Sequence, residues 1–185
     1  MILPPELLTE VFVHCTEGTA VYIPPSKQIL DGSLPWNLAH VSSRWRQIAM
    51  NEPRLWTTIS LASLRRADFR SEAESVFERS VRRPSLLLTL KVVTLDLPHL
   101  GLSDSDDLVR WIFEKHGHRI GSLECSSEVR AGMWAFLGLS PGLFQSLRSI
   151  TLRLRVSFRI TWWLSQGEAR VFQGIPGLRT ATIQF

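Results

Sequence analysis

The sequence predicts a small all-α module followed by an α/β solenoid with a parallel sheet. Residues 1–56 carry apolar side chains at helical spacing, whereas from residue 57 onward strand-like segments alternate with helical ones. The chain has 185 residues, of which 44% are hydrophobic. This is enough for one good core, or for a small module joined to a larger one. We therefore expect a helical module at 1–56 and a solenoid at 57–185.

The first helix is expected to begin at the segment Leu3-Pro4-Pro5-Glu6. Proline suits the first turn because an N–H group there has no intrahelical partner to lose. The carboxylate of Glu6 lies where the helix dipole favours a negative charge. The apolar residues that follow fall on one helical face: Leu7, Leu8, Val11 and Phe12.

A second helix is predicted after a proline-rich insert at residues 16–35. Residues 17–35 contain several turn formers, so we interpret them as a loop, either a spacer or a contact loop. Pro53 is expected to end the second helix, because the residue before a proline avoids α geometry. The apolar residues at helical spacing in this helix are Leu38, Val41, Trp45, Ile48 and Ala49, and Leu55 and Trp56 follow them.

The rest of the chain is predicted to form strands separated by helices. Helices are expected at 63–82 and from Ser103 or Asp104 to Gly117. Strand-like alternation marks the segments 57–61, 86–93, 120–125, 147–156 and 178–185. The strands share a short sequence frame, as in Leu147-x-x-Ile150-x-Leu152. The frame opens with a large residue, and apolar residues follow it three and five positions later.

The frame recurs at steps of about 29, 35, 27 and 31 residues, a period typical of repeat proteins. Units of this kind stack and bring their strands into a parallel sheet. The tail therefore resembles a degenerate leucine-rich-repeat solenoid. Since the sequence ends on apolar Phe185, just after a strand, we expect further repeats to be lacking or truncated at the C-terminus.

About the first third of the chain resembles the F-box family, in the version abundant in mushroom-forming fungi. The resemblance rests on four motifs that occur in the family's order. They are Leu3-Pro4-Pro5-Glu6, the apolar helix from Leu7 to Phe12, Val41-Ser42-Ser43-Arg44-Trp45-Arg46, and Pro53-Arg54-Leu55-Trp56. The insert at 16–35 is longer than the usual link between the first two helices of the family.

The resemblance implies a non-catalytic subunit of a Skp–cullin–F-box ubiquitin ligase, located in the cytoplasm or the nucleus. The N-terminal module would bind a Skp-type adaptor, and through it a cullin, while the repeats would bind an unknown target protein. We expect Leu7 and Leu8 to face outward and Trp45 to face inward. The expected adaptor-binding residues are Leu3, Pro4, Pro5, Leu7, Leu8, Val11, Phe12, Val41, Trp45, Leu55 and Trp56.

The expected target-binding residues lie between the core positions of the strands, on the concave face of the predicted sheet. Arg153 and Arg155 are the first candidates for contact with an acidic target. The whole set is Thr89, Lys91, Glu124, Thr151, Arg153, Arg155 and Gln184. Two other functions stay open: a repeat scaffold for protein–protein interaction outside any ligase, and an α/β hydrolase-like enzyme.

Composition and motifs argue against several other classes. No apolar run reaches membrane-spanning length, and no secretory signal peptide is recognisable. The net charge of +4 comes with basic residues interleaved with acids, so we do not expect nucleic-acid binding. Cys15 and Cys125 are interpreted as two reduced thiols.

We predict no cofactor, metal or catalytic residue. His116-Gly117-His118 lacks further ligands at zinc spacing and is interpreted as a helix end. The acidic cluster at residues 104–107 fits helix capping better than a calcium loop. No nucleophile motif or phosphate-binding glycine loop occurs.

Overall fold

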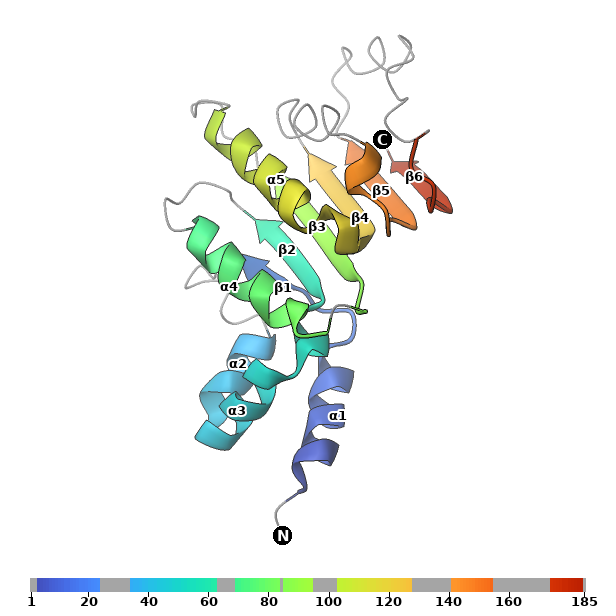
Figure 1. Ribbon diagram of the computed structural model, residues 1–185. Coiled ribbons are helices and arrows are strands. Elements are labelled where there is room, and N and C mark those ends of the chain that lie inside the picture. Colours follow the sequence, from blue (N-terminus) through green and yellow to red (C-terminus); the bar gives the residue numbers. More distant parts are fainter. Residues whose placement is uncertain are drawn as a thin grey trace.

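The computed structural model describes residues 3–23, 34–62, 69–83, 85–94, 103–127, 141–154 and 174–184. The longer helices are α1 Pro5–Thr16, α2 Leu34–Val41, α3 Ser43–Asn51, α4 Phe69–Val81 and α5 Ser103–His116. Short 3-10 helices are η2 Pro53–Trp56, η3 Gly117–Arg119 and η4 Pro141–Leu143. The strands are β1 Val21–Ile23, β2 Thr58–Ala62, β3 Leu88–Thr94, β4 Ile120–Ser127, β5 Ser149–Leu154 and β6 Thr180–Gln184. The chain is a mixed α/β protein (Figure 1).

The six strands form one sheet, in the order in which they occur in the sequence. Each strand pairs in parallel with the next. The frame noted in the sequence keeps its register in β2, β4, β5 and β6, where Ile59, Leu123, Ile150 and Ala181 hold equivalent positions. In β3 that position belongs to Leu90, two residues after Leu88, from which the expected spacing was counted. The predicted parallel sheet is confirmed, and the strands after residue 57 fall within two residues of where they are expected to begin.

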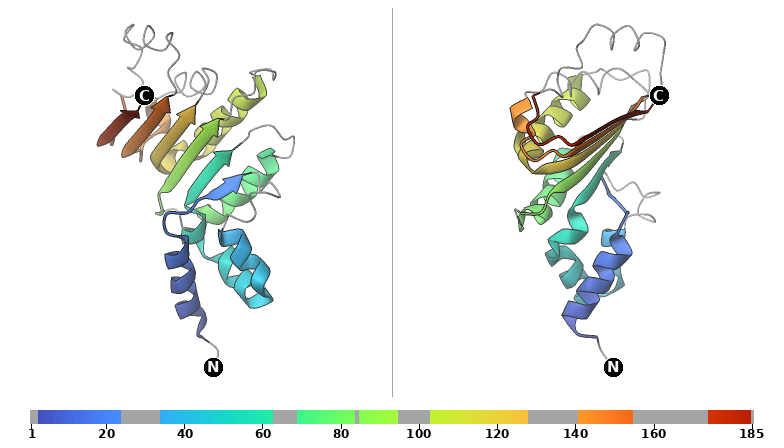
Figure 2. Two further views of the ribbon diagram at one scale, coloured as in Figure 1. Left: turned by 180° about the vertical axis from the view of Figure 1, so that it is seen from behind. Right: turned by 90° about the vertical axis from the view of Figure 1, so that its right-hand side faces the viewer.

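Among the described residues, the helices that cover the sheet lie on one of its faces. Figure 1 shows α4 and α5 lying across the same face, and the two views of Figure 2 show the opposite face without helices. The core lies between the sheet and these helices, where Phe77 of α4 and Phe113 of α5 pack with Ile59, Leu90 and Leu123. The residues that alternate with these strand positions therefore point to the open face.

The proline-rich insert contains a strand, which corrects the expectation of a loop at 17–35. Within that range, Val21 and Ile23 of β1 are buried and lie in register with Ile59 and Leu61 of β2. Three residues are too short to show strand alternation, and the turn formers around them dominate the local pattern. Since β1 joins the sheet, the expected boundary between residues 56 and 57 does not coincide with the edge of the sheet. Residues 24–33 of the insert lie outside the described residues.

The run predicted as a single second helix is two helices, α2 and α3, separated at Ser42. Ser42 has an extended backbone, and its hydroxyl accepts a hydrogen bond from the backbone N–H of Trp45 (3.2 Å). A serine N-cap of this kind begins a new helix rather than continuing the old one. Pro53 acts as expected only in part, because it ends α3 but also starts η2.

The three N-terminal helices are joined to the sheet region through Trp56 of η2. Its side chain is 0% exposed, and its indole Nε1 donates to the carbonyl oxygen of Ala49 (2.8 Å). Trp36 meets it edge-on, with the ring centroids 5.0 Å apart. The guanidinium of Arg79 on α4 lies 5.0 Å from the Trp56 ring and 5.1 Å from the Trp36 ring. One hydrophobic cluster therefore runs from α1 into the sheet.

Candidate functional site

The exposed face of α1 carries a row of apolar side chains. Leu3 is 50% exposed, Leu7 is 54% exposed and Val11 is 49% exposed. They recur every four residues, so they lie along one side of the helix and its N-terminal extension. Val41, at the end of α2, is 61% exposed. Since α2 contacts α1, we group Val41 with the row and call Leu3, Leu7, Val11 and Val41 the apolar stripe.

The apolar stripe is unusual for this chain. Among the described residues, five large aliphatic side chains are exposed, and four of them form the stripe. The fifth, Val81, lies at the end of α4 and is 43% exposed. A concentration of exposed apolar side chains on one small group of helices is typical of interaction surfaces.

Leu8 and Phe12 form the opposite, buried side of α1. Leu8 is 6% exposed, and Phe12 is 1% exposed and meets the half-buried ring of Trp45 at 4.7 Å. The expectation that Leu7 and Leu8 both face outward is therefore wrong for Leu8. Consecutive residues of a helix point about 100° apart, so a narrow core contact takes only one of the two.

The expected adaptor-binding residues fall into two groups. The stripe residues, together with Pro4 and Pro5, are exposed. Leu8, Phe12, Leu55 and Trp56 belong instead to the buried core, and the half-buried Trp45 packs against it. The buried members are excluded from direct contact with a partner because the chain itself already covers them.

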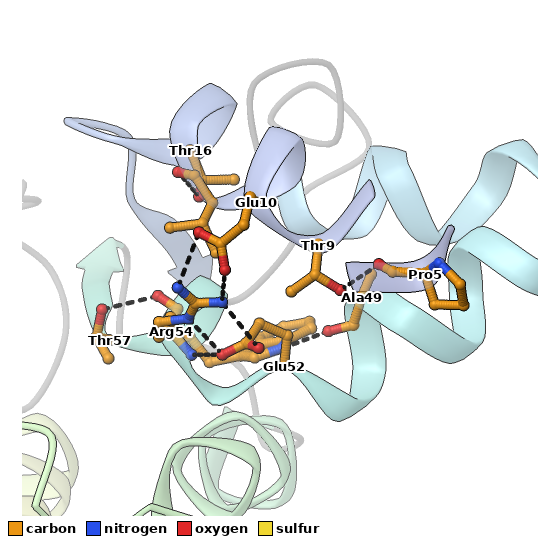
Figure 3. A network of polar contacts seen from close by, with 10 residues as sticks. Pro5, Thr9, Glu10, Thr16, Ala49, Glu52, Arg54 and Thr57 are labelled. Atoms are coloured by element: carbon orange, nitrogen blue, oxygen red, sulfur yellow. Dashed lines mark hydrogen bonds and ion pairs between the residues drawn. The ribbon is translucent and has the colours of Figure 1, made fainter. Parts of the chain in front are cut away.

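A charged network fixes α1 against η2 and so fixes the direction in which the stripe faces. Arg54 donates from Nη2 to Glu10 Oε1 (2.7 Å) and from Nη1 to Glu10 Oε2 (3.2 Å), as Figure 3 shows. It also donates from Nε to Glu52 Oε1 (2.9 Å). Such a two-pronged contact between a guanidinium and a carboxylate has a defined geometry. The orientation of α1 is thus set by more than apolar packing.

The charges of this network stabilise one another. The hydrogen bonds from Arg54 hold the pKa of Glu10 below its ordinary value. Burial raises the pKa of Glu52, but the hydrogen bonds from the side chain and backbone of Arg54 outweigh burial and leave that pKa lowered. The two carboxylates in turn raise the pKa of Arg54. A second arginine, Arg44, donates to the carbonyl oxygen of Leu3 and ties the start of the stripe to α3.

The open face of the sheet carries polar side chains in register. Lys91, Glu124 and Thr151 follow one another across β3, β4 and β5. Lys91 Nζ lies 3.5 Å from one oxygen of Glu124, and Arg153 Nη1 lies 2.9 Å from the other. Arg153 Nε also donates to Gln184 Oε1 (3.0 Å). Arg153 is therefore already paired within the sheet, and Arg155 lies outside the described residues.

The remaining expected target-binding residue, Thr89, belongs to a row of hydroxyl side chains on the same face. It pairs in register with Thr58 on one side and Ser122 on the other. Both Thr89 and Thr151 are half-buried. The structure thus brings the described candidates together on one face, but as an internally paired surface rather than as free charges.

The histidines and cysteines that could carry metal or thiol chemistry include His116, His118 and Cys125. Within the described segments, no three His, Cys, Asp or Glu side chains gather as metal ligands would. His116 is buried and stacks on Phe77 with the rings 4.3 Å apart, whereas His118 is exposed. Burial raises the pKa of the Cys125 thiol to about 12, which keeps it protonated and unreactive. No described helix has both the length and the apolar character needed to cross a membrane.

The chain was compared with family models, with curated proteins and with solved structures. None of the three comparisons returns a match. The interpretation of the stripe and of the open face therefore rests on the residues themselves.

Because His116 is buried, we expect the folded protein to lose stability in acid. Burial, and next to it the charges of Lys115 and Arg119, lower its pKa from 6.5 to about 4, while Glu74 opposes this weakly. Since the unfolded chain takes up this proton first, stability is complete above about pH 6.5 and declines as the pH falls toward 4, by up to about 3 kcal/mol. We expect His116→Phe, which keeps the ring stacked on Phe77, to flatten this part of the stability curve.

The measurement is the urea unfolding free energy at several pH values between 7 and 4. His40→Gln, a change at an exposed histidine of α2, serves as the control and should keep the wild-type slope. Identical slopes for wild type and His116→Phe would show that His116 is not the group responsible.

Proposed function

We propose that this protein is the target-recruiting subunit of a ubiquitin ligase of the Skp–cullin–F-box type. The observation that carries the proposal is the apolar stripe, because it lies within the segment that resembles the F-box. The four motifs of that family occur in order between Leu3 and Trp56. A partner that covers the stripe would remove from water the apolar side chains that the chain itself leaves exposed.

The arrangement of the chain supports a mechanism in which its two ends bind different partners. Helix α1, which carries most of the stripe, lies at the lower end of the molecule in Figure 1, and β6 lies at the far end of the sheet from it. In the proposed mechanism the stripe binds a Skp-type adaptor, and the sheet region holds a target protein. Holding both at once raises the effective concentration of the target's lysines near the ubiquitin-charged enzyme. The protein itself would supply position rather than chemistry.

The first experiment is co-purification of the whole chain with a Skp-type adaptor and a cullin. We expect the adaptor to bind the wild type and to bind Leu7→Asp at least about tenfold more weakly, because aspartate places a charge on an apolar contact. A well-characterised F-box protein tested in parallel shows that the adaptor is active. If that protein binds and this chain does not, the proposal fails.

A further inference from the structure

The positive charge of this chain is concentrated in its last third. Residues 129–185 hold seven arginines, no lysine and one acidic residue, Glu168, which gives a net charge of +6. Residues 1–128 hold fourteen basic and sixteen acidic residues, which gives −2. The basic residues are therefore interleaved with acids only in the first two thirds, which corrects the sequence-based description. A charge imbalance of this size favours acidic partners for this part of the chain.

Two of these arginines lie side by side where the chain enters β5 and β6. Arg148 directly precedes β5, and Arg179 directly precedes β6. The backbone N–H of Arg179 donates to the carbonyl oxygen of Arg148 (2.8 Å), so the two residues occupy equivalent positions on neighbouring strands. Like charges at neighbouring positions of a sheet repel one another. An anion placed between the two side chains would relieve this repulsion.

Neither guanidinium has a partner among the described residues. The side chains of both Arg148 and Arg179 are exposed, with no hydrogen bond or ion pair to any described group. Several other arginines of the described segments differ: Arg54 binds two carboxylates, Arg153 binds Glu124 and Gln184, and Arg119 binds the carbonyl oxygen of Ser80. Arg83 and Arg110 are exposed as the pair is, but they do not line the hollow described next. The pair before β5 and β6 is therefore available to a ligand.

A hollow of about 400 Å³ adjoins the pair. It is lined by both arginines and by Gln145, Ser146 and Gly177 of the same two turns. Gly177 lets the turns lie close together, because a Cβ atom there would lie 3.2 Å from the carbonyl oxygen of Leu147. The amide of Gln145 and the hydroxyl of Ser146 add hydrogen-bond donors beside the two cations. The hollow thus combines space, donors and positive charge.

We propose that this hollow binds an oxyanion carried by an acidic peptide segment, either a carboxylate or a phosphate group. The planar guanidinium forks of two arginines match the oxygen pairs of both groups. A peptide fits better than a nucleic acid, since the hollow is a single site and no described aromatic side chain lines it for base stacking. The identification of this peptide as part of the ligase target rests on the proposed function. The binding of an acidic peptide to the hollow does not depend on that function.

The experiment measures binding of fluorescent peptides to the purified whole chain by anisotropy, at several salt concentrations. The probes share one Gly/Ser sequence with a central phosphoserine, a Glu-Glu pair or unmodified serine, and a single-stranded RNA serves as the competing class. We expect the two acidic peptides to bind and the neutral one not to bind, and their relative affinities identify the preferred oxyanion. R148Q/R179Q should weaken binding about tenfold, as the loss of two exposed ion pairs predicts.

The matched control is R83Q/R110Q, which removes the same charge from two exposed arginines elsewhere. It should change the affinity less than about twofold. The inference is overturned if both double variants weaken binding equally, if neither acidic peptide binds, or if RNA binds more tightly and loses that binding in R148Q/R179Q. Circular dichroism confirms that each variant is folded. Because no adaptor is present, failure here leaves the adaptor proposal untouched.

Discussion

Replacing Leu8 by aspartate is expected to unfold the protein or to remove most of its stability. The side chain of Leu8 is 6% exposed and lies in the hydrophobic core on the buried side of α1. A carboxylate forced into such a site loses its hydration without compensation, at a cost of about 4 kcal/mol or more. Domains of this size are stable by only about 5–15 kcal/mol. Urea unfolding followed by far-ultraviolet circular dichroism measures the loss.

The same substitution one residue earlier is the matched control. Leu7 belongs to the exposed stripe, so Leu7→Asp is expected to change the unfolding free energy by less than about 0.5 kcal/mol. The comparison tests the assignment of the two sides of α1 with the same chemical change. Equal losses of stability at both positions would contradict it, because the helix would then bury both side chains.

The second large effect is expected at Trp56, where the N-terminal helices meet α4. Trp56→Ala removes a fully buried ring and its hydrogen bond to Ala49, and leaves Arg79 without one of its two aromatic neighbours. Replacing a large buried aromatic residue by alanine costs about 3–5 kcal/mol. Trp111→Ala, at a half-buried ring on α5, should cost less.

The central position of Trp56 also leads to an expectation about the unfolding transition. Because one hydrophobic cluster runs from α1 to the sheet, we expect helix content and tryptophan fluorescence to fall in a single transition. A separate early transition for the N-terminal helices, or a loss at Trp56→Ala no larger than that at Trp111→Ala, would show that the two parts are not coupled through this residue.

The strands could be predicted from the sequence because their pattern is simple. Alternation places Ile59 and Leu61, or Ile150 and Leu152, on the buried side, and the repeating frame predicts that neighbouring strands are parallel. The strand β1 could not be predicted in this way, because three residues between turn formers carry too little pattern. Its burial depends on pairing with β2, far away in the sequence.

The candidate site was predictable as a segment but not in its individual side chains. The apolar positions of α1 form one broad face in the sequence, and spacing alone does not tell which edge of that face meets the rest of the chain. Contacts from Trp45 to Phe12 and from Arg54 to Glu10 decide it. Arg148 and Arg179 were missed, although both follow the leucine that opens the repeating frame, and this shared position places them side by side.

The central claim is that the apolar stripe is the surface on which an adaptor binds. The most direct test compares Val11→Asp with Val81→Asp in binding to a Skp-type adaptor, measured by calorimetry on the whole chain. The two valines have similar exposure, on α1 and on α4, and undergo the same change. The account predicts that Val11→Asp binds at least about tenfold more weakly than wild type, while Val81→Asp binds as wild type does. Unchanged affinity in Val11→Asp, or an equal loss in both variants, would contradict it.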